Sequence, residues 1–495
     1  MKWTALWVVL AFALAVGGTE INFNFAGLIP AQECPPAEPC ETNPLVEFTE
    51  SLSAGAKVHT PPTPTFQQIL SSYFTSALDG SSFPALIVQP AEVSDVVKAV
   101  NFARERGLNF GVKSGGHGHN GMGIPPFGLL LDLSLMRAVE VDEEENTIRF
   151  QGGAICGDLD AATQPYNRAA VCGNCYSIGA GFIAHGGYGA LSRLHGLAID
   201  NLVSVDLVTA AGQVVTASES ENEDLFWAVR GALPNFGVAV SFVVRTHDVS
   251  TYYGGVARFG ISSAMPIVEW LTSQSNNPNL HARVSATPPA QTFAMEVALW
   301  GDGTVEEKAA FFTPLLEIEG LLSSTVGTPT YFQQQLASKP NLDAAPRRQK
   351  GFTIAGNNQR DSAEFYSTYI EHYLTIPFST GASAMNFWGG AIAEVPRNAT
   401  AFWGRGLEVD WFMTALFVNP VTDVATLKAG LGEAAAALSN VEGALPDVNG
   451  NWLSTTQEGI VERMYGDNLE RLRELKAVWD PNNFFKANYN ILPAE

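Results

Sequence analysis

The sequence predicts an α+β protein built from two domains of different character. Its 495 residues are enough for more than one large core, and 46% of them are hydrophobic while only 16% are charged, which is typical of a globular chain. From Phe83 onward, short apolar strands alternate with helical patterns and with glycine-rich connections. Near residue 250 the glycine-rich loops stop, and longer helical segments alternate with strands. This change in the connections places the domain boundary between residues 248 and 249.

The first domain, residues 67–248, has a readable order of elements. ALIVQP is a short apolar strand ended by proline, and AEVSDVVKAVNFARERG has apolar residues at helical spacing with a closing glycine. NFGVKSGG is a strand that runs into a glycine turn. The segment ENEDLFWAVRG is expected to be a helix. Further strands are expected in FGLLLDLS, VEVDEE, TIRFQGGA, LVSVDLVTAAGQVVTAS and VAVSFVVRTH.

The second domain is assigned to residues 249–468. AMPIVEWLTSQ has helical spacing, while FAMEVALWGDG, SAMNFWGGAIAEV and LEVDWFMTALFV contain the strands of an antiparallel sheet. The C-terminal segment, residues 469–495, begins with a helix that Asp480-Pro481 ends. It is expected to return to the first domain. Residues 19–66 are rich in proline and are predicted to be an irregular lead-in, which a bond between Cys34 and Cys40 could staple.

The N-terminus predicts secretion. One lysine is followed by an apolar run from Trp3 to Val16 and then by small residues, the pattern of a cleaved signal peptide spanning residues 1–18. A signal anchor is the alternative. No other apolar run reaches the length needed to span a membrane. Asn398-Ala399-Thr400 is a glycosylation sequon, which fits an extracellular protein.

The charge balance narrows the possible partners. The chain carries 28 basic and 50 acidic residues, a net charge of −22, and has no run of Lys or Arg. Nucleic acids and anionic membranes both select basic surfaces, so neither is expected as a partner. A neutral or weakly cationic small molecule is the expected substrate.

The cysteines and glycine loops each have several interpretations. Five cysteines leave an odd one in an oxidising compartment. Cys172-Gly173-Asn174-Cys175 could be a redox pair or half a zinc site, but no further ligands lie nearby, and a disulfide that involves Cys172 is the third option. GAGFIA at 179–184 fits a dinucleotide fingerprint, although the preceding VCGNCYSI makes a poor buried strand. VKSGGHGHN at 112–120 could be a phosphate-binding loop, a metal site, the place of a catalytic base or a plain polar turn. No carboxylate cluster accompanies its histidines.

The order of these motifs resembles that of the FAD-linked oxidases similar to berberine bridge enzyme, which have the vanillyl-alcohol-oxidase type of FAD fold. The resemblance runs from about Phe83 to Tyr489 and is closest in the first domain and the tail. It implies a two-subdomain FAD-binding domain and a substrate domain with an antiparallel sheet and helices. The motifs are SGGH at 114–117, LDLS at 131–134, GNC at 173–175, GGYGALSRLHGLAIDN at 186–201, DLFWAVRG at 224–231, NFG at 235–237, GGAIAEVPRNATAF at 389–402, YGDNLERL and WDPNNFF.

The resemblance implies a bicovalent FAD. By analogy, His117 is joined to the 8α-methyl group of the flavin and Cys175 to its C6, which would account for the odd cysteine and leave four to pair. Ile178 matches the family position near the oxygen side of the ring, where a β-branched residue is typical of oxidases. The remaining candidate cofactor-binding residues are Ser114, Gly115, Gly116, Gly179, Ala180, Gly181 and Val238.

The implied reaction is oxidation of an alcohol, with molecular oxygen as the acceptor and hydrogen peroxide as a product. A carbohydrate is the first expectation for the substrate; a small alkaloid-like or terpenoid metabolite, or a secreted flavoprotein without turnover, are the alternatives. The family tyrosine that assists deprotonation has no match in residues 447–452. The resemblance puts Asp410 where family members often have a polar residue that faces the flavin, which makes it the candidate base; the alternative is that Glu408 and Asp410 face solvent. His185, where the family usually has a hydrophobic residue or glycine, is either structural or an active-site group.

Overall fold

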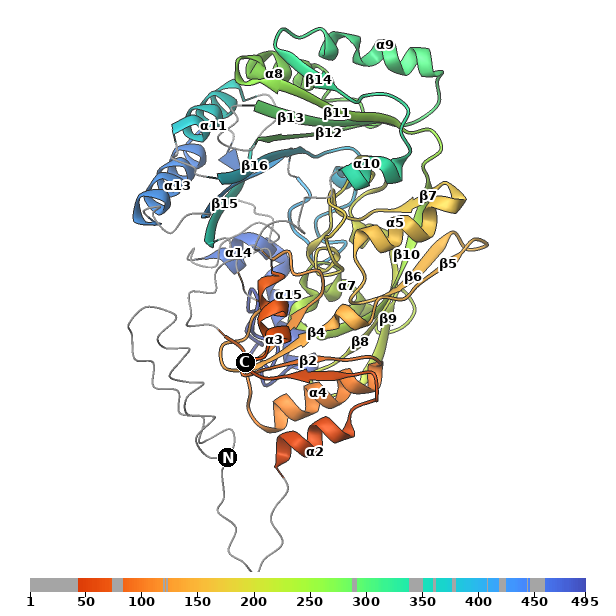
Figure 1. Cartoon of the computed structure of the whole chain (residues 1–495), viewed down its shortest axis with the longest axis vertical. Coiled ribbons are helices and arrows are strands. Elements are labelled where there is room, and N and C mark those ends of the chain that lie inside the picture. The colour runs from red at the N-terminus through yellow and green to blue at the C-terminus, as the bar shows by residue number, and fades with distance from the viewer. Residues whose placement is uncertain are drawn as a thin grey trace, which may run out of the picture.

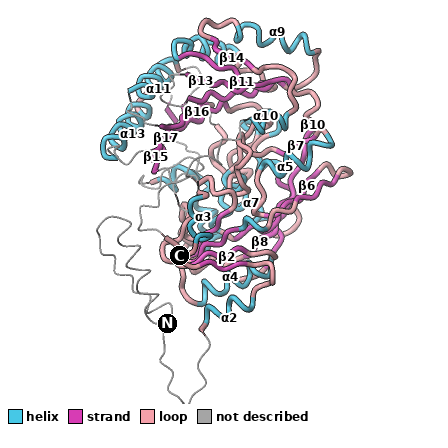
Figure 2. Tube along the Cα trace, in the orientation of Figure 1, coloured by secondary structure: helices cyan, strands magenta, loops and turns pink. Residues whose placement is uncertain are grey.

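The computed structural model describes residues 43–73, 83–118, 121, 123–286, 292–337, 350–358, 362–375, 380–406, 408–417, 424–442, 444–445 and 459–495. The predicted signal peptide, Cys34, Cys40, His119 and residues 447–452 lie outside these ranges. Figures 1 and 2 show three β-sheets placed along the long axis, with the two smaller sheets in the lower half and the largest sheet at the top.

The first sheet has the strand order β1-β2-β4-β3 among the described residues. Two of its three pairings are typical of an α/β layer: β4 is parallel to both β2 and β3, and only β1 runs antiparallel to β2. All four residues of both LIVQ and LLLD are buried, as expected for strands covered on both faces. The strands are β1 (Lys57–His59), β2 (Leu86–Gln89), β3 (Phe110–Lys113) and β4 (Leu129–Asp132), and the helices are α2 (Pro44–Ser51), α3 (Pro64–Ser71) and α4 (Val93–Glu105).

The end of the Pro-rich lead-in is not irregular, so that prediction is wrong for residues 43–66. Asn43 caps α2 by accepting a hydrogen bond from the Leu45 amide, and proline occupies the first position of the helix, where it has no amide to lose. The helix then buries Phe48, whose ring stacks at 4.2 Å on Phe102 of α4. The proline content of this segment suggests irregular structure, but a proline at the first position of a helix favours the helical backbone.

The second sheet has the order β5-β6-β10-β8-β9, with β7 paired to the end of β10. Every pairing between its described strands is antiparallel, and the helices α5 and α7 cover the sheet. Its core gathers aromatic residues from strands and helix alike, including Phe150, Phe242 and Phe226. The elements are β5 (Val139–Asp142), β6 (Thr147–Gln151), α5 (Cys156–Thr163), β7 (Arg168–Ala170), α6 (Ser192–His195), β8 (Leu202–Val208), β9 (Val214–Ser218), α7 (Glu223–Ala232) and β10 (Val238–Asp248).

The third sheet is antiparallel, with the order β14-β11-β13-β12-β16-β17-β15-β18. The helices α8, α9, α11 and α13 cover its outer face, and the inner face is turned toward the first two sheets (Figure 1). The strands are β11 (Tyr253–Gly260), β12 (Leu280–Ala286), β13 (Thr292–Leu299), β14 (Leu321–Ser324), β15 (Lys350–Asn358), β16 (Thr380–Phe387), β17 (Val409–Phe417) and β18 (Ala444–Leu445). The helices are α8 (Ala264–Ser273), α9 (Val305–Leu316), α10 (Tyr331–Ala337), α11 (Ala363–Thr375), α12 (Ala391–Glu394) and α13 (Val424–Ser439).

The C-terminal segment packs against the first domain, as the resemblance implied. It contains α14 (Ile460–Tyr465) and α15 (Leu469–Trp479). Lys476 is fully buried, where it pairs with Asp480 at 2.6 Å and donates to the Asn235 carbonyl. The Asn235 side chain in turn donates to the Tyr489 carbonyl and accepts from the Ile491 amide. The tail is thereby fixed beside the start of β10.

Two buried arginines join the upper and lower halves. Arg405, which precedes β17, forms a two-point ion pair with Asp200 at 2.6 and 2.9 Å, and its side chain is 1% exposed. Arg193 of α6 donates to the Trp388 carbonyl at 2.7 Å and to the Asn277 carbonyl at 2.8 Å. Since buried charges are costly unless paired, these contacts fix the inner face of the large sheet against the first domain.

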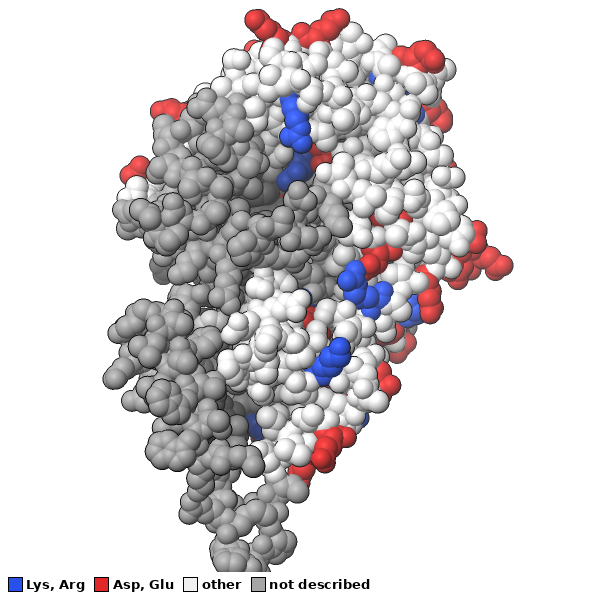
Figure 3. Space-filling view, viewed as in Figure 1, with Lys and Arg blue, Asp and Glu red and all other residues white. Residues whose placement is uncertain are grey.

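The described surface carries mostly acidic charge at its margins. On the face shown in Figure 3, Asp and Glu side chains gather at the outer edges, and Lys and Arg side chains form small separate groups. Within the described ranges, no helix is long and apolar enough to cross a membrane. The described residues likewise hold no group of three or more His, Cys, Asp or Glu side chains that could bind a metal ion.

Candidate functional site

A long cavity lies between the first two sheets and the C-terminal tail. It encloses about 1450 Å³ of empty space, part of it open to solvent. Most of its wall comes from four segments far apart in the sequence, within residues 110–118, 178–185, 233–239 and 485–489. The other lining residues are Tyr73, Gly121, Gly123, Leu133, Gly152 and Phe242. Of the predicted cofactor-binding residues, those that line it are Ser114, Gly115, Gly116, His117, Ile178, Gly179, Ala180, Gly181 and Val238.

The two glycine loops of this cavity touch each other through their backbones. A Cβ atom added to Gly115 would lie 2.5 Å from the Gly179 amide nitrogen, and one added to Gly179 would lie 2.2 Å from the Gly115 nitrogen. Gly116 has a φ of +73°, which a residue with a side chain rarely adopts. Glycine is therefore required at these positions, and the main chain itself forms this part of the wall. Backbone amides exposed in this way suit the oxygens of a pyrophosphate.

His117 and Cys175, which are 58 positions apart, meet at one hydroxyl group. The Ser177 Oγ lies 2.8 Å from His117 Nε2 and 3.6 Å from Cys175 Sγ. The ring nitrogen and the sulfur therefore cannot be further apart than the sum of those two distances. Both predicted attachment residues thus stand at the same end of the glycine loops, close enough to reach neighbouring positions on one aromatic ring.

Three buried polar atoms on the cavity wall have no hydrogen-bond partner within the described protein. They are Tyr73 Oη, Ser114 Oγ and Asn488 Oδ1. Burial, and to a lesser degree the Asp132 carboxylate, raise the pKa of Tyr73, so its hydroxyl stays protonated and able to donate. Unmet polar groups are costly inside a protein, and an elongated ligand rich in hydroxyl and phosphate oxygens would satisfy them. The residues present therefore fit FAD.

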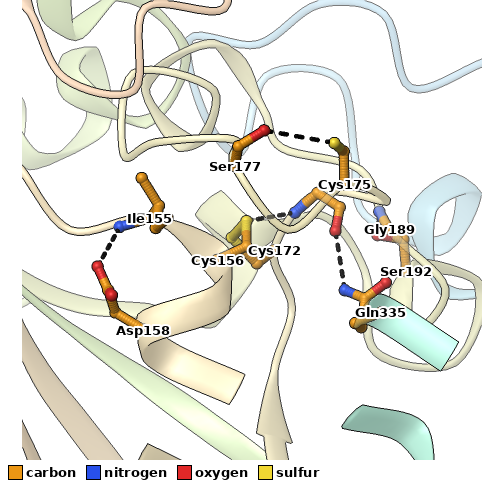
Figure 4. The surroundings of a disulfide bond; sticks show 10 residues. Ile155, Cys156, Asp158, Cys172, Cys175, Ser177, Gly189, Ser192 and Gln335 are labelled. Atoms are coloured by element: carbon orange, nitrogen blue, oxygen red, sulfur yellow. Dashed lines mark hydrogen bonds between the residues drawn. A yellow bond between two sulfur atoms is a disulfide. The ribbon is translucent and has the colours of Figure 1, made fainter. Parts of the chain in front are cut away.

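The loop that carries Cys175 is held by a disulfide between Cys156 and Cys172 (Figure 4). Cys175 is not in a disulfide. The pair Cys172 and Cys175 is thus not a redox couple, because Cys172 is bonded to Cys156 instead. Backbone bonds add to the restraint, because the Cys156 amide donates to the Ile178 carbonyl at 2.8 Å and Gln335 of α10 donates to the Gly173 carbonyl at 3.1 Å.

Replacing both Cys156 and Cys172 by serine should lower the free energy of unfolding by about 3 kcal/mol, the loss expected for a closed loop of this length. The two cysteines are 16 positions apart. Denaturant titration of the double variant beside the parent measures the difference. The parent, reduced before the titration, should match the variant. An unchanged unfolding midpoint would contradict the expected contribution of this bond.

His185 lies on the cavity wall, so the structure places it facing the cofactor site. It is half-buried, its Nδ1 lies 3.3 Å from the Gly181 carbonyl oxygen, and its ring meets Tyr489 edge-on at 6.2 Å. Burial lowers the pKa of the imidazole, and the Gly181 carbonyl offsets this only in part. His185 is therefore a neutral polar group at neutral pH. His185 therefore lines the cavity and also bonds within its own loop.

Asp410 is buried on the inner face of the large sheet. Its side chain is 1% exposed, whereas its neighbours Val409 and Trp411 point into the core beneath the outer helices. Asn386 Nδ2 donates to Asp410 Oδ2 at 3.3 Å. The alternative that Glu408 and Asp410 both face solvent is wrong for Asp410 and holds for Glu408, which is exposed. The strand begins at Val409, so Glu408 lies beyond the covered part of the sheet.

A row of polar residues crosses the inner face of this sheet, and sequence analysis did not find it. Glu296, Arg283, Asn386 and Asp410 occupy directly paired positions on four neighbouring strands. Burial raises the pKa of Glu296, while Arg283 and Gln334 act in the opposite direction. Alternation along each strand was visible in the sequence, but the register between strands is needed to bring the four residues into line. We call these four residues the polar row.

Sequence analysis also missed Tyr73, Ser177 and Asn488. Tyr73 lies before the first predicted strand. Ser177 lies two positions after Cys175, and Asn488 lies shortly after the WDPNNFF motif. A polar residue two positions after a predicted attachment residue is the signal that could have identified Ser177, whereas Asn488 carries no such signal.

Comparison with known proteins places this geometry among flavoproteins. Residues 84–218 match the family described as FAD binding domain, and residues 450–492 match the family described as berberine and berberine like. An FAD-linked oxidoreductase of Dictyostelium discoideum is 29% identical over 427 residues, which cover 84% of this chain and 91% of that protein. The xylooligosaccharide oxidase of Thermothelomyces thermophilus is 29% identical over 450 residues, covering 83% and 88%.

Two solved structures have the same fold. The 6-hydroxy-D-nicotine oxidase of Arthrobacter nicotinovorans superposes with a TM-score of 0.78 at 24% identity, covering 89% of this chain and 99% of that one. Glucooligosaccharide oxidase from Acremonium strictum superposes with a TM-score of 0.77 at 21% identity, covering 91% and 99%, and it carries a 6-S-cysteinyl, 8α-N1-histidyl FAD. The α+β architecture, with a vanillyl-alcohol-oxidase type FAD-binding fold and a second domain, is therefore confirmed.

Proposed function

Because the chain belongs to the FAD-linked oxidases similar to berberine bridge enzyme, we propose that it oxidises an alcohol to a carbonyl compound while molecular oxygen is reduced to hydrogen peroxide. The observation that carries the proposal is the meeting of His117 and Cys175 at the Ser177 hydroxyl, beside the cavity that the glycine loops line. Such a reaction needs a held electron acceptor, a base for the hydroxyl proton and a surface that orients the substrate.

His117 and Cys175 would hold FAD covalently at one end of the cavity. The backbone of the loops at Gly115 and Gly179 would face its phosphates, and Tyr73 and Asn488 would bond its other polar groups. When bound, the flavin supplies a two-electron acceptor that oxygen can reoxidise. The pattern of two attachments is supported by the histidyl and cysteinyl FAD of the glucooligosaccharide oxidase.

Asp410 is the proposed base for the substrate hydroxyl proton. A carboxylate withdrawn from water can act as a general base, and the contact from Asn386 at 3.3 Å fixes the position of one of its oxygens. Its neighbours Val409 and Trp411 belong to the core beneath the outer helices, so the Asp410 side chain is on the opposite, inner face of the sheet. Its place in the polar row gives it neighbours that can bind other hydroxyl groups of the same molecule.

The polar row supports a carbohydrate as the substrate. Sugar hydroxyl groups both donate and accept hydrogen bonds, so a surface that alternates acids, an amide and a guanidinium can bind several of them at once. The similarity to a xylooligosaccharide oxidase supports the same class. Secretion is part of the proposal: the disulfide suits an oxidising compartment, and Asn398 of the sequon is exposed.

Two measurements test this proposal: acid precipitation of one sample, and peroxide assays on a second, native sample. The purified protein should be yellow, and the colour should stay with the precipitated chain. Peroxide should then form with mono- or oligosaccharides in preference to aromatic alcohols and alkaloid-like compounds. Loss of colour to the supernatant would contradict covalent attachment, and a preference for the aromatic compounds would contradict the carbohydrate assignment. Silence on the whole panel would contradict the oxidase itself.

A further inference from the structure

We propose that Ser177 is the residue that orients both attachment residues of the flavin. In this arrangement its hydroxyl accepts a hydrogen bond from His117 Nε2–H and donates its own hydrogen to the sulfur of Cys175. The inference rests on the proposed bicovalent attachment and adds a positioning residue to it. A serine hydroxyl has one hydrogen to donate and lone pairs to accept with, so it can serve both residues at once.

The backbone around Ser177 is fixed on both sides. The Gly157 amide donates to the Tyr176 carbonyl at 2.9 Å, and the Cys156 amide donates to the Ile178 carbonyl at 2.8 Å. The Ile178 amide closes a turn on the Cys175 carbonyl at 3.1 Å. Because the disulfide anchors the same helix start, the Ser177 side chain has a defined place between the two loops. A hydroxyl so restrained can hold its partners in one geometry.

The contact with His117 selects the nitrogen that forms the bond. In a neutral imidazole one nitrogen carries the hydrogen and the other carries the lone pair, and a partner of one nitrogen decides the tautomer. Nε2 lies 2.8 Å from Ser177 Oγ. If Nε2–H donates to this oxygen, the lone pair is on Nδ1, which then acts as the nucleophile toward the flavin methyl group.

The contact with Cys175 holds the sulfur at the same hydroxyl. A partner of fixed position limits the directions from which the sulfur can approach a carbon atom of the flavin. Ser177 Oγ lies 3.6 Å from Cys175 Sγ, within the range for a hydrogen bond to sulfur. With its lone pair engaged by histidine, the hydroxyl has its hydrogen directed to the sulfur. One side chain thus prepares two nucleophiles.

Both attachment steps balance with oxygen as the oxidant. For each, a C–H bond of the flavin is replaced by a C–N or a C–S bond, and the nucleophile gives up its own hydrogen. The two hydrogens and two electrons reduce one molecule of oxygen to hydrogen peroxide. Attachment therefore releases one hydrogen peroxide for each bond formed, independently of any substrate.

The test compares Ser177→Thr, which keeps the hydroxyl, with Ser177→Val, which has nearly the same shape without it. Ser177→Ala gives the smaller deletion, and Ser367→Ala, an exposed serine on α11, is the matched control. Each variant is made without flavin and mixed with FAD in air. Attachment at each residue is followed by mass spectrometry of the peptides that hold His117 and Cys175, and by the peroxide released. Circular dichroism and bound non-covalent FAD report the fold.

Ser177→Val and Ser177→Ala should slow attachment at both residues by about 10- to 100-fold, the effect of one hydrogen bond to a charged or reacting group. Ser177→Thr and Ser367→Ala should attach FAD at rates near that of the parent. Equal rates for the Thr and Val variants at both residues would overturn the role of Ser177, while a parent that itself forms neither bond would instead overturn the proposed bicovalent attachment. If the Val and Ala variants lose their fold, the comparison is made with Ser177→Gly, which also lacks the hydroxyl, and an attachment rate near that of the parent there overturns the proposal.

Discussion

Asp410→Asn is expected to slow substrate oxidation by about 10²- to 10⁴-fold, the usual contribution of a general base. The amide has the shape of the carboxylate but cannot take up the substrate's proton. Since Asn386 already donates to Oδ2 at 3.3 Å, that oxygen can remain an acceptor and the sheet should be undisturbed. The flavin should remain attached in full, because Asp410 is not one of the residues that line the cofactor cavity.

The measurement for Asp410 is the rate at which substrate bleaches the flavin absorbance without oxygen, with peroxide formation as the steady-state check. Glu408→Gln is the matched control, since Glu408 is an exposed carboxylate two positions earlier on the same side of the chain. It should oxidise substrate at the rate of the parent. A parent-like rate for Asp410→Asn would assign the proton transfer to another group and leave Asp410 as a structural member of the polar row.

The sequence predicted local structure well where one element decides its own form. AEVSDVVKAVNFARERG becomes α4, FGLLLDLS contains β4, and LEVDWFM contains the start of β17. Hydrophobic spacing, glycine and capping residues act within a few positions and can be read directly. The irregular assignment of residues 43–66 failed because the burial of Phe48 against Phe102 is a contact between distant segments.

The candidate site shows the same division. The glycine loops and both predicted attachment residues come from motifs, and nine of the predicted cofactor-binding residues line one cavity. The bridging hydroxyl of Ser177 and the polar row were missed, because each exists only when separate strands or loops are brought together. For Asp410, the period of the strand predicted that it shares a side with Glu408. Only domain packing determines that one of the two is buried and the other exposed.

Asp160 should make the protein less stable as the pH rises from about 4 to about 7. This aspartate of α5 is 2% exposed, and its Oδ2 has no hydrogen-bond partner among the described residues. Burial raises its pKa from 3.8 to about 7, although Gln335 opposes the shift. Between these two values the folded state keeps the proton while the unfolded state releases it, so unfolding becomes more favourable with rising pH. Below pH 4 both states are protonated and the penalty is absent.

Asp160→Asn should remove this penalty, because a neutral amide replaces the buried acid at every pH. Over the interval from 3.8 to about 7 the penalty grows to roughly 4 kcal/mol, so the variant should be more stable than the parent by up to that amount at pH 8 and similar to it at pH 4. Denaturant titrations at pH 4, 6 and 8 measure the difference. Asp302 is an exposed aspartate that lines the same surface hollow as Asp160. The unfolding free energy of Asp302→Asn should therefore change with pH as that of the parent does. If the Asp160→Asn and parent profiles ran parallel, the buried carboxyl would be ionised in the folded protein. The carboxyl of Asp160 would then need a counter-charge from the residues packed against α5.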